Sequence, residues 1–192
     1  MNVPVFHKQI LWSLMFGPPF YHPTLIMNMK ILRQAGVDTY PSNYPHAEDY
    51  GLYIKLLGKV EFANLDESLL KYRISATSVS AKHKLMQHKV ALHLRREAFE
   101  MLSGESLPDS TWAELNEYGT TSVNALQVFG WFKKINEQNS LLEEVEFQRR
   151  ILIYIKQLIL KRGLSISSFP WFLRQLVRDP TMIKYLFHFS FK

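Results

Sequence analysis

The chain has 192 residues, enough for one ordinary domain and a small appendage, and 47% of them are hydrophobic and 21% charged, which is typical of a globular protein. It contains no cysteine, which excludes a disulfide scaffold, a cysteine nucleophile and a zinc site built from cysteines. The net charge of +6 is uneven, because residues 1–146 hold 14 Lys and Arg against 16 Asp and Glu, whereas residues 147–192 hold 9 Lys and Arg against Asp179 alone.

The first eighty residues mix short helical and short extended patterns. Gly17-Pro18-Pro19 interrupts the first helical pattern, and Gly36 ends the second. The clearest helix in this half repeats apolar residues at helical spacing and ends at Gly58. The expected elements are a helix over 5–15, a strand over 21–27, a helical turn over 30–34, a helix over 48–57, and strands over 60–63 and 69–74.

From residue 81 onward the pattern becomes helical throughout. We therefore expect two domains, residues 1–80 and residues 81–192. The fold class expected is a mixed α/β part followed by an all-α region, and the chain as a whole is mostly helical. The expected helices of the second part cover 81–102, 110–118, 122–135, 141–161, 166–177 and 181–187.

No stretch approaches the ~18–20 apolar residues that a membrane-spanning helix needs, and the N-terminus lacks the pattern of a secretory signal. We therefore expect a cytoplasmic protein that is soluble or peripheral. The basic segment 147–192 is rich in aromatic residues, which suits the surface of an anionic membrane. The alternative is a helical subdomain with aromatic residues in its core and solvated Lys and Arg. Nucleic acid is not an expected partner.

Three short segments follow one another in a characteristic order. The first is His22-Pro23-Thr24, the second is Ala47-Glu48-Asp49-Tyr50, and the third is Tyr72-Arg73-Ile74-Ser75. In these segments and their spacing, residues 18–82 resemble the C-terminal half of family 2 glycosyltransferases of the GT-A type. Motifs that agree together with their context are more specific than any one motif. The resemblance implies that residues 1–80 are an α+β fragment of a GT-A fold, on its acceptor side.

The resemblance also implies a reaction. An inverting glycosyltransferase moves a sugar from a nucleotide-sugar to a hydroxyl of a glycan or lipid-linked acceptor, here in surface polysaccharide assembly. A carboxylate must take the proton of that hydroxyl. By the resemblance Asp49 is this general base, and Glu48 orients it or binds the acceptor. The alternative is that both acidic residues only cap a helix and offset its dipole. The substrate-binding residues that the resemblance implies are His22, Thr24, Tyr50, Arg73 and Ser75.

The chain departs from the family pattern in several places. Ser75 stands where many members have a histidine, and Gly51 stands where an acidic residue often follows the motif. A divalent cation, Mg²⁺ or Mn²⁺, is expected for the family, but the Asp-X-Asp triplet that binds it is absent, so no metal ligand is assigned. We therefore expect the chain to be inactive, or nearly so, without an N-terminal nucleotide-binding half. The alternative function is a non-catalytic helical module that binds a membrane or a protein.

Overall fold

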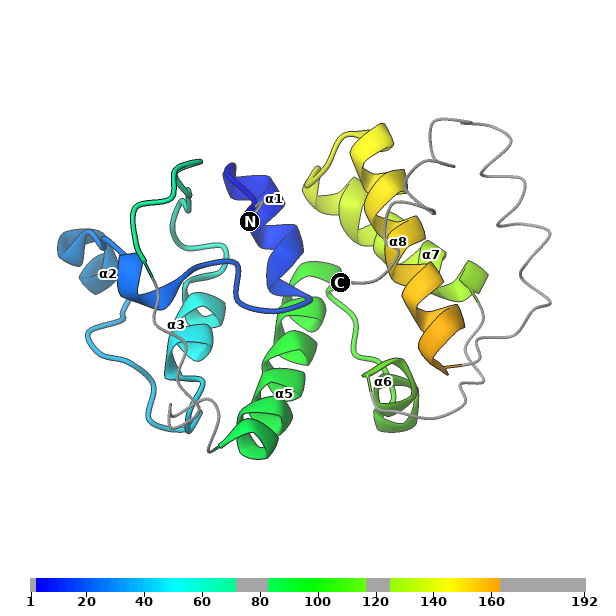
Figure 1. Ribbon diagram of the computed structural model, residues 1–192, viewed down its shortest axis with the longest axis horizontal. Helices are drawn as coiled ribbons and strands as arrows, with labels where there is room; N and C mark the ends of the chain where they lie inside the picture. Colours follow the sequence, from blue (N-terminus) through cyan, green and yellow to red (C-terminus); the bar gives the residue numbers. More distant parts are fainter. Residues whose placement is uncertain (1–2, 72–82, 117–124, 163–192) are drawn as a thin grey trace. The chain divides into compact units, whose positions relative to one another are not determined.

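The computed structural model describes residues 3–71, 83–116 and 125–162 (Figure 1). It forms two compact units, Met1–Leu102 and Ser103–Lys192, and each is described by itself. The domain boundary expected near residue 81 falls within 72–82, outside the described residues, and stays a prediction.

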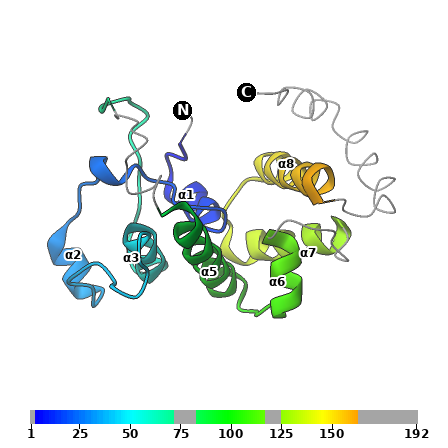
Figure 2. The same ribbon diagram turned by 60° about the horizontal axis from the view of Figure 1, so that its bottom comes forward.

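The first unit is built from short helices and one long one (Figures 1 and 2). Asn28 caps the second helix, accepting hydrogen bonds from the backbone N–H groups of Lys30 and Ile31 at 3.1 and 3.4 Å. Gly36 and Gly58 follow the second and third helices with φ of 75°, a left-handed conformation that suits glycine after a helix. In chain order the elements are α1 (His7–Leu14), the 3₁₀ turn η1 (His22–Thr24), α2 (Met29–Gln34), α3 (Glu48–Leu56) and α5 (Lys84–Ser103).

Helix α3 is almost entirely buried, and it is the element that positions the candidate site. Tyr50 is 1% exposed and donates its hydroxyl hydrogen to the backbone carbonyl of Leu14, which ties α3 to the end of α1. Leu52 and Leu56 join Leu32 and Val37 in an apolar cluster. Because the apolar residues recur at helical spacing, this one helix contacts both α1 and the α2 region.

Helix α5 holds the loop that precedes α3. The hydroxyl of Tyr44 donates to the carboxylate of Glu97, with distances of 3.0 and 3.1 Å to its two oxygens. The side-chain amide of Gln87 donates to the backbone carbonyl of His46 at 2.9 Å. Burial raises the pKa of Tyr44, and its hydrogen bond with Glu97 raises it further, so the hydroxyl stays protonated and keeps donating.

The expected α/β fold is wrong, because the described residues contain no strand. Residues 21–27 form the turn η1 and irregular backbone instead. Residues 60–63 are irregular, and Phe62 donates its backbone N–H to Nδ1 of His7 rather than to a neighbouring strand. A strand requires a ladder of hydrogen bonds to a second backbone segment, and this segment has none among the described residues. Of the strand expected over 69–74, residues 69–71 are irregular and the rest lie outside the described residues.

The second unit is helical, as the sequence predicts. It contains α6 (Asp109–Asn116), α7 (Ala125–Asn139) and α8 (Glu144–Arg162). Helices α7 and α8 pack against each other (Figure 1). The helices expected over 166–177 and 181–187, and most of the basic segment 147–192, lie outside the described residues. No helix of the described ranges has both the length and the apolarity needed to cross a membrane. The buried apolar residues of α7 and α8 are Val128, Phe132, Ile135, Phe147, Ile151, Leu152, Ile155 and Leu158.

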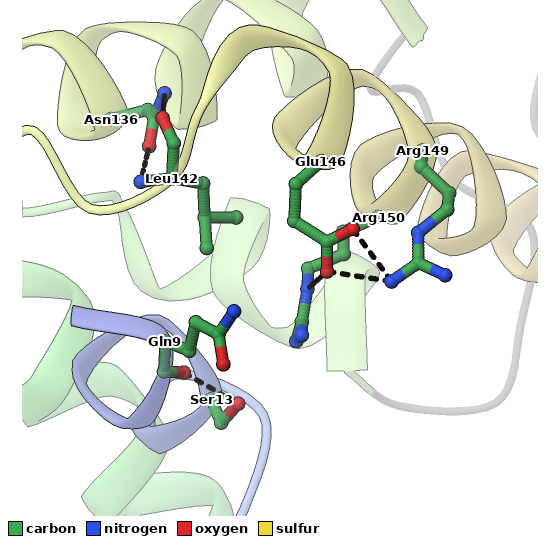
Figure 3. A network of polar contacts seen from close by, with 7 residues as sticks. All are labelled: Gln9, Ser13, Asn136, Leu142, Glu146, Arg149 and Arg150. Atoms are coloured by element: carbon green, nitrogen blue, oxygen red, sulfur yellow. Dashed lines mark hydrogen bonds and ion pairs between the residues drawn. The ribbon is translucent and has the colours of Figure 1, made fainter. Parts of the chain in front are cut away.

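A buried asparagine closes the connection between α7 and α8. Asn136 is 7% exposed, and its side chain both accepts from the backbone N–H of Leu142 at 2.8 Å and donates to the carbonyl of the same residue at 3.0 Å (Figure 3). Leu142 is itself buried. One amide side chain therefore provides hydrogen-bond partners for two buried backbone groups that water does not reach.

Replacing Asn136 with Ala is expected to destabilise the second unit by about 2–3 kcal/mol, because both backbone groups of Leu142 lose their partner. Denaturant unfolding followed by tryptophan fluorescence measures this change. Gln138→Ala, an exposed change in the same helix turn, is the control and should stay within about 0.5 kcal/mol of wild type. Equal stability of the two variants would show that the hydrogen bonds of Asn136 contribute nothing.

Glu146 forms an ion pair with two arginines of its own helix. Its carboxylate accepts hydrogen bonds from Arg149 at 2.6 Å and from Arg150 at 2.5 Å (Figure 3). Burial alone would raise the pKa of Glu146, but the hydrogen bonds and positive charges of the two arginines outweigh the effect of burial, and the pKa is lowered from 4.5.

A hydrogen bond within α1 is drawn in the same view. Ser13 donates its hydroxyl hydrogen to the backbone carbonyl of Gln9, one helical turn earlier (Figure 3).

Because the pKa of Glu146 is lower in the folded chain than in the unfolded one, its contribution to stability is complete above the unfolded pKa and is lost as the pH falls through the folded pKa. We expect Glu146→Gln to cost about 0.5–1 kcal/mol at pH 7 and less below pH ~4. Denaturant unfolding at pH 7, 4 and 3 measures this. Glu137→Gln, in an exposed pair with Lys133 at 3.6 Å, is the control. If the loss of unfolding free energy caused by Glu146→Gln does not change with pH, the lowered pKa of Glu146 does not contribute to stability.

Candidate functional site

The candidate site begins at the N-terminus of α3. Asp49 lies in the first turn and is half-buried, and one of its carboxylate oxygens, Oδ1, accepts the backbone N–H of Tyr50 at 2.8 Å. The positive end of the helix dipole favours an ionised carboxylate at this position. Asp49 therefore has one fixed oxygen and one oxygen that can accept a proton.

Glu48 holds the turn before α3. Its Oε1 accepts the backbone N–H of His46 at 3.0 Å. His46 has φ of 64°, a left-handed conformation that is uncommon for a residue with a side chain, so this hydrogen bond stabilises a strained turn. The ring of His46 stacks on that of His83 at the start of α5, with ring centres 3.9 Å apart. Glu48 thus orients the segment that carries Asp49.

Tyr40 lies against His22, a residue of the 3₁₀ turn η1. The rings of His22 and Tyr40 meet edge to face, with centres 5.5 Å apart, and both side chains are exposed. Partial burial raises the pKa of Tyr40, and the negative charge of Asp49 adds to the rise.

Tyr53 lies one helical turn after Asp49, on the same face of α3. Its side chain is 2% exposed, and its ring meets that of Phe20 edge to face with centres 4.7 Å apart. Its hydroxyl is buried and has no hydrogen-bond partner among the described residues. Burial is the main reason that its pKa is raised, and the charges of Asp49 and Tyr40 raise it further. The Tyr53 hydroxyl therefore stays protonated.

The other candidate residues are placed as follows. Thr24 is exposed, and its hydroxyl donates to the backbone carbonyl of Tyr21 at 2.8 Å within η1. Tyr50 lies in the core, where its hydroxyl donates to the backbone carbonyl of Leu14. Arg73 and Ser75 lie outside the described residues. The structure therefore places Glu48 and Asp49 in the first turn of α3, Tyr50 in the core behind them, and His22 against Tyr40. The roles of these residues stay predictions.

A cavity of about 140 Å³ opens between the segment 20–32, helix α3 and the segment 60–63. Most of its lining residues are apolar, with Asn28 and Glu61 as polar members. Tyr53 also belongs to the wall.

Sequence reasoning did not single out Tyr40 or Tyr53 as site residues. The spacing of Asp49 and Tyr53, four positions apart on a helix, is a local signal that two side chains share a face. This spacing does not single out Tyr53, because Tyr53 also fits the apolar stripe of the same helix. No local signal points to Tyr40, because its place depends on the path of the loop between α2 and α3.

The divalent cation that the sequence resemblance implies stays a prediction. Within the described ranges, no three His, Asp or Glu side chains gather closely enough to hold a metal ion.

Comparison with known proteins gives one partial match. No known protein family matches the chain, and no solved structure does. A Haemophilus influenzae protein that is named only as an uncharacterized glycosyltransferase is 29% identical over 94 residues, which are 49% of this chain. The aligned part is 29% of that protein, so the chain spans less than a third of its relative's length. The match supports a relationship to glycosyltransferases at this general level.

Proposed function

We propose that this chain carries the acceptor-side part of a glycosyltransferase of the family 2 type, which transfers a sugar from a nucleotide-sugar to a hydroxyl of a glycan or lipid-linked acceptor in surface polysaccharide assembly. The observation that carries the proposal is Asp49, half-buried in the first turn of α3, with one carboxylate oxygen held by the backbone N–H of Tyr50. The partial match to a protein named as a glycosyltransferase supports it. A nucleotide-binding half completes the enzyme.

The proposed mechanism needs a base on the acceptor side. The acceptor oxygen attacks C1 of the donor sugar, its proton passes to Oδ2 of Asp49, and the bond from C1 to the diphosphate oxygen breaks. The nucleoside diphosphate leaves with the electron pair of that bond, and the configuration at C1 inverts. Asp49 suits this task because its Oδ1 is already held by Tyr50, which fixes the carboxylate.

The surroundings of Asp49 suit an acceptor rather than a nucleotide. His22 and Tyr40 are exposed and offer ring faces and polar edges, and stacking on aromatic rings is a common way to bind sugars and other flat apolar surfaces. The carboxylate of Glu48 accepts the backbone N–H of His46, so Glu48 affects the reaction by fixing the segment that carries Asp49.

The test of the proposal is a transfer assay with the chain complemented by an N-terminal nucleotide-binding half. A panel of nucleotide-sugars is offered with short glycan acceptors, and NMR reads the anomeric configuration of the product. We expect transfer with inversion at C1. Transfer with retention, or no transfer with any donor while the folded chain binds its complement, would overturn the proposal.

A further inference from the structure

The start of α5 holds the turn that leads into α3. The ring of His83, which directly precedes α5, stacks on the ring of His46, with centres 3.9 Å apart and 12° between the ring planes. One helical turn later, the side-chain amide of Gln87 donates to the backbone carbonyl of His46 at 2.9 Å. The backbone N–H of Gln87 also donates to the carbonyl of His83 at 2.9 Å. Two neighbouring side chains at one helix end therefore hold the same residue.

His46 needs this support because its backbone is left-handed, with φ of 64°. A residue with a side chain keeps such a conformation only where its surroundings fix it. Its N–H donates to Glu48, its carbonyl accepts from Gln87, and its ring stacks on His83. Asp49 follows three residues later, in the first turn of α3. A release of His46 from α5 would therefore change the backbone that leads to Asp49.

The stack of His46 on His83 depends on charge. Histidine is the side chain that ordinarily changes its charge between pH 5 and 8, and His83 is exposed while His46 is half-buried. Two neutral rings can stack, whereas two protonated rings would place like charges 3.9 Å apart, which repel each other. The pair also lies at the starts of α3 and α5, where the positive ends of the helix dipoles disfavour a further positive charge.

The charged groups near the pair offset only a first proton. Glu48 is the nearer of two carboxylates at the start of α3, since it accepts the N–H of His46. The first two turns of α5 carry only basic side chains, so a second proton on the pair leaves an excess of positive charge. Within the described residues, the charged and titratable groups on these two helix starts are Glu48, Asp49, Lys84, His88 and Lys89.

We propose that His83 and Gln87 are positioning residues for Asp49, and that the stack of His83 on His46 opens in weak acid and so lowers sugar transfer. The inference rests on the proposed function for the role of Asp49, and it goes beyond that function by naming a regulation of the same site. His83 and Gln87 act through the backbone of His46 and do not touch the substrate.

A second contact between α5 and the loop before α3 does not share this sensitivity. Tyr44 donates to the carboxylate of Glu97, and the same carboxylate pairs with His93 at 3.0 Å. A proton on His93 strengthens that pair, because it adds a positive charge beside a negative one. An opening of the loop in acid therefore points to His46 and His83.

The side-chain amide of Gln87 reports the attachment without catalysis. In the full ¹⁵N-labelled chain, its NMR signals should move toward those of a solvated amide between pH 7.5 and pH 5, because the bond to His46 is lost. His83→Phe keeps a ring that can stack on a protonated His46, so these signals should stay in place. His83→Ala has no ring and should show the low-pH signals already at pH 7.5.

His88→Phe is the matched control, because His88 is an exposed histidine of the same helix and should leave the wild-type behaviour unchanged. Gln87 signals that stay in place in wild type, or that move equally in His83→Phe, would overturn the proposal.

Transfer kinetics of the complemented chain test the positioning role. Between pH 7.5 and 5.5, wild-type kcat should fall at least ~10-fold while the acceptor KM changes less than about threefold. The kcat of His83→Phe should change less than about twofold over the same range, and since Asp49 is present in both proteins, the difference belongs to the stack. Gln87→Ala should lower kcat about 3- to 10-fold at both pH values. An unchanged kcat in Gln87→Ala would remove Gln87 from the assignment.

The two readouts separate this inference from the proposed function. If the Gln87 signals behave as expected but Asp49→Asn still transfers sugar, the proposed function fails alone. If Asp49→Asn loses activity while wild type and His83→Phe share one pH profile and one set of Gln87 signals, the pH-sensitive attachment fails alone.

Discussion

Asp49→Asn is expected to lower kcat for sugar transfer by about 10²–10⁴-fold, because an amide cannot take the proton of the acceptor hydroxyl. The amide oxygen can still accept the backbone N–H of Tyr50, so the helix start keeps its hydrogen bond and the fold should be unchanged. The donor KM should stay within about threefold of wild type, since the loss falls on the transition state. Steady-state transfer kinetics of the complemented chain measure both constants.

Two further variants make this result specific to Asp49. Asp38→Asn removes an exposed carboxylate from the loop before α3 and should leave kcat unchanged. Glu48→Gln keeps an oxygen that can accept the N–H of His46, so it should stay within about tenfold of wild type. If Glu48→Gln loses as much activity as Asp49→Asn, the base is Glu48. If Asp49→Asn keeps full activity, neither the base nor the site is where we propose it.

The helices could be predicted from sequence because their signals are local. The helix expected over 48–57 is found over Glu48–Leu56, since its start is set by two acidic residues and its end by Gly58. The same holds for α7 and α8, whose apolar residues repeat at helical spacing.

The strands expected over 21–27 and 60–63 are wrong, because a strand depends on a distant partner that a local pattern does not reveal. Residues 60–63 carry the composition of a strand, but the backbone N–H of Phe62 finds Nδ1 of His7, a residue 55 positions away. Asn64 likewise bonds to Val5 and Pro4 near the N-terminus. Tyr40 was missed for the same reason, because its contact with His22 depends on a loop and not on a repeat. Asp49 can be named from its motif, and its role stays a prediction, whereas the contact between Tyr40 and His22 required the structure.

Gly51 shows how a departure from a family pattern is explained by packing. An ideal Cβ built at this residue lies 2.2 Å from Cδ2 of Tyr44 and 3.0 Å from Cγ of Pro41, so no side chain fits. The ring of Tyr44 cannot easily move aside, because its hydroxyl is bonded to Glu97 and its side chain is 8% exposed. An acidic residue at this position would drive the loop off the helix that carries Asp49.

Gly51→Ala is therefore expected to destabilise the first unit by about 1–3 kcal/mol, even though alanine favours a helix over glycine by about 0.5–1 kcal/mol. The melting temperature of the first unit, which has the size of a small domain, should fall by about 4–8 °C for each kcal/mol. Gly130→Ala is the matched control, because Gly130 lies inside α7 with open space around it and should gain the helix preference without a clash. The two Gly→Ala changes should thus have opposite signs.

The clash can be traced to Tyr44 with a double-mutant cycle. Tyr44→Ala removes the ring that meets the new methyl group, so Gly51→Ala in that background should cost little or become stabilising. The expected coupling between the two changes is about 1–3 kcal/mol. Additive effects would place the strain elsewhere. Because Tyr44 also connects the loop before α3 to α5, a loss of transfer activity in Gly51→Ala without a loss of folding would show that this loop positions Asp49.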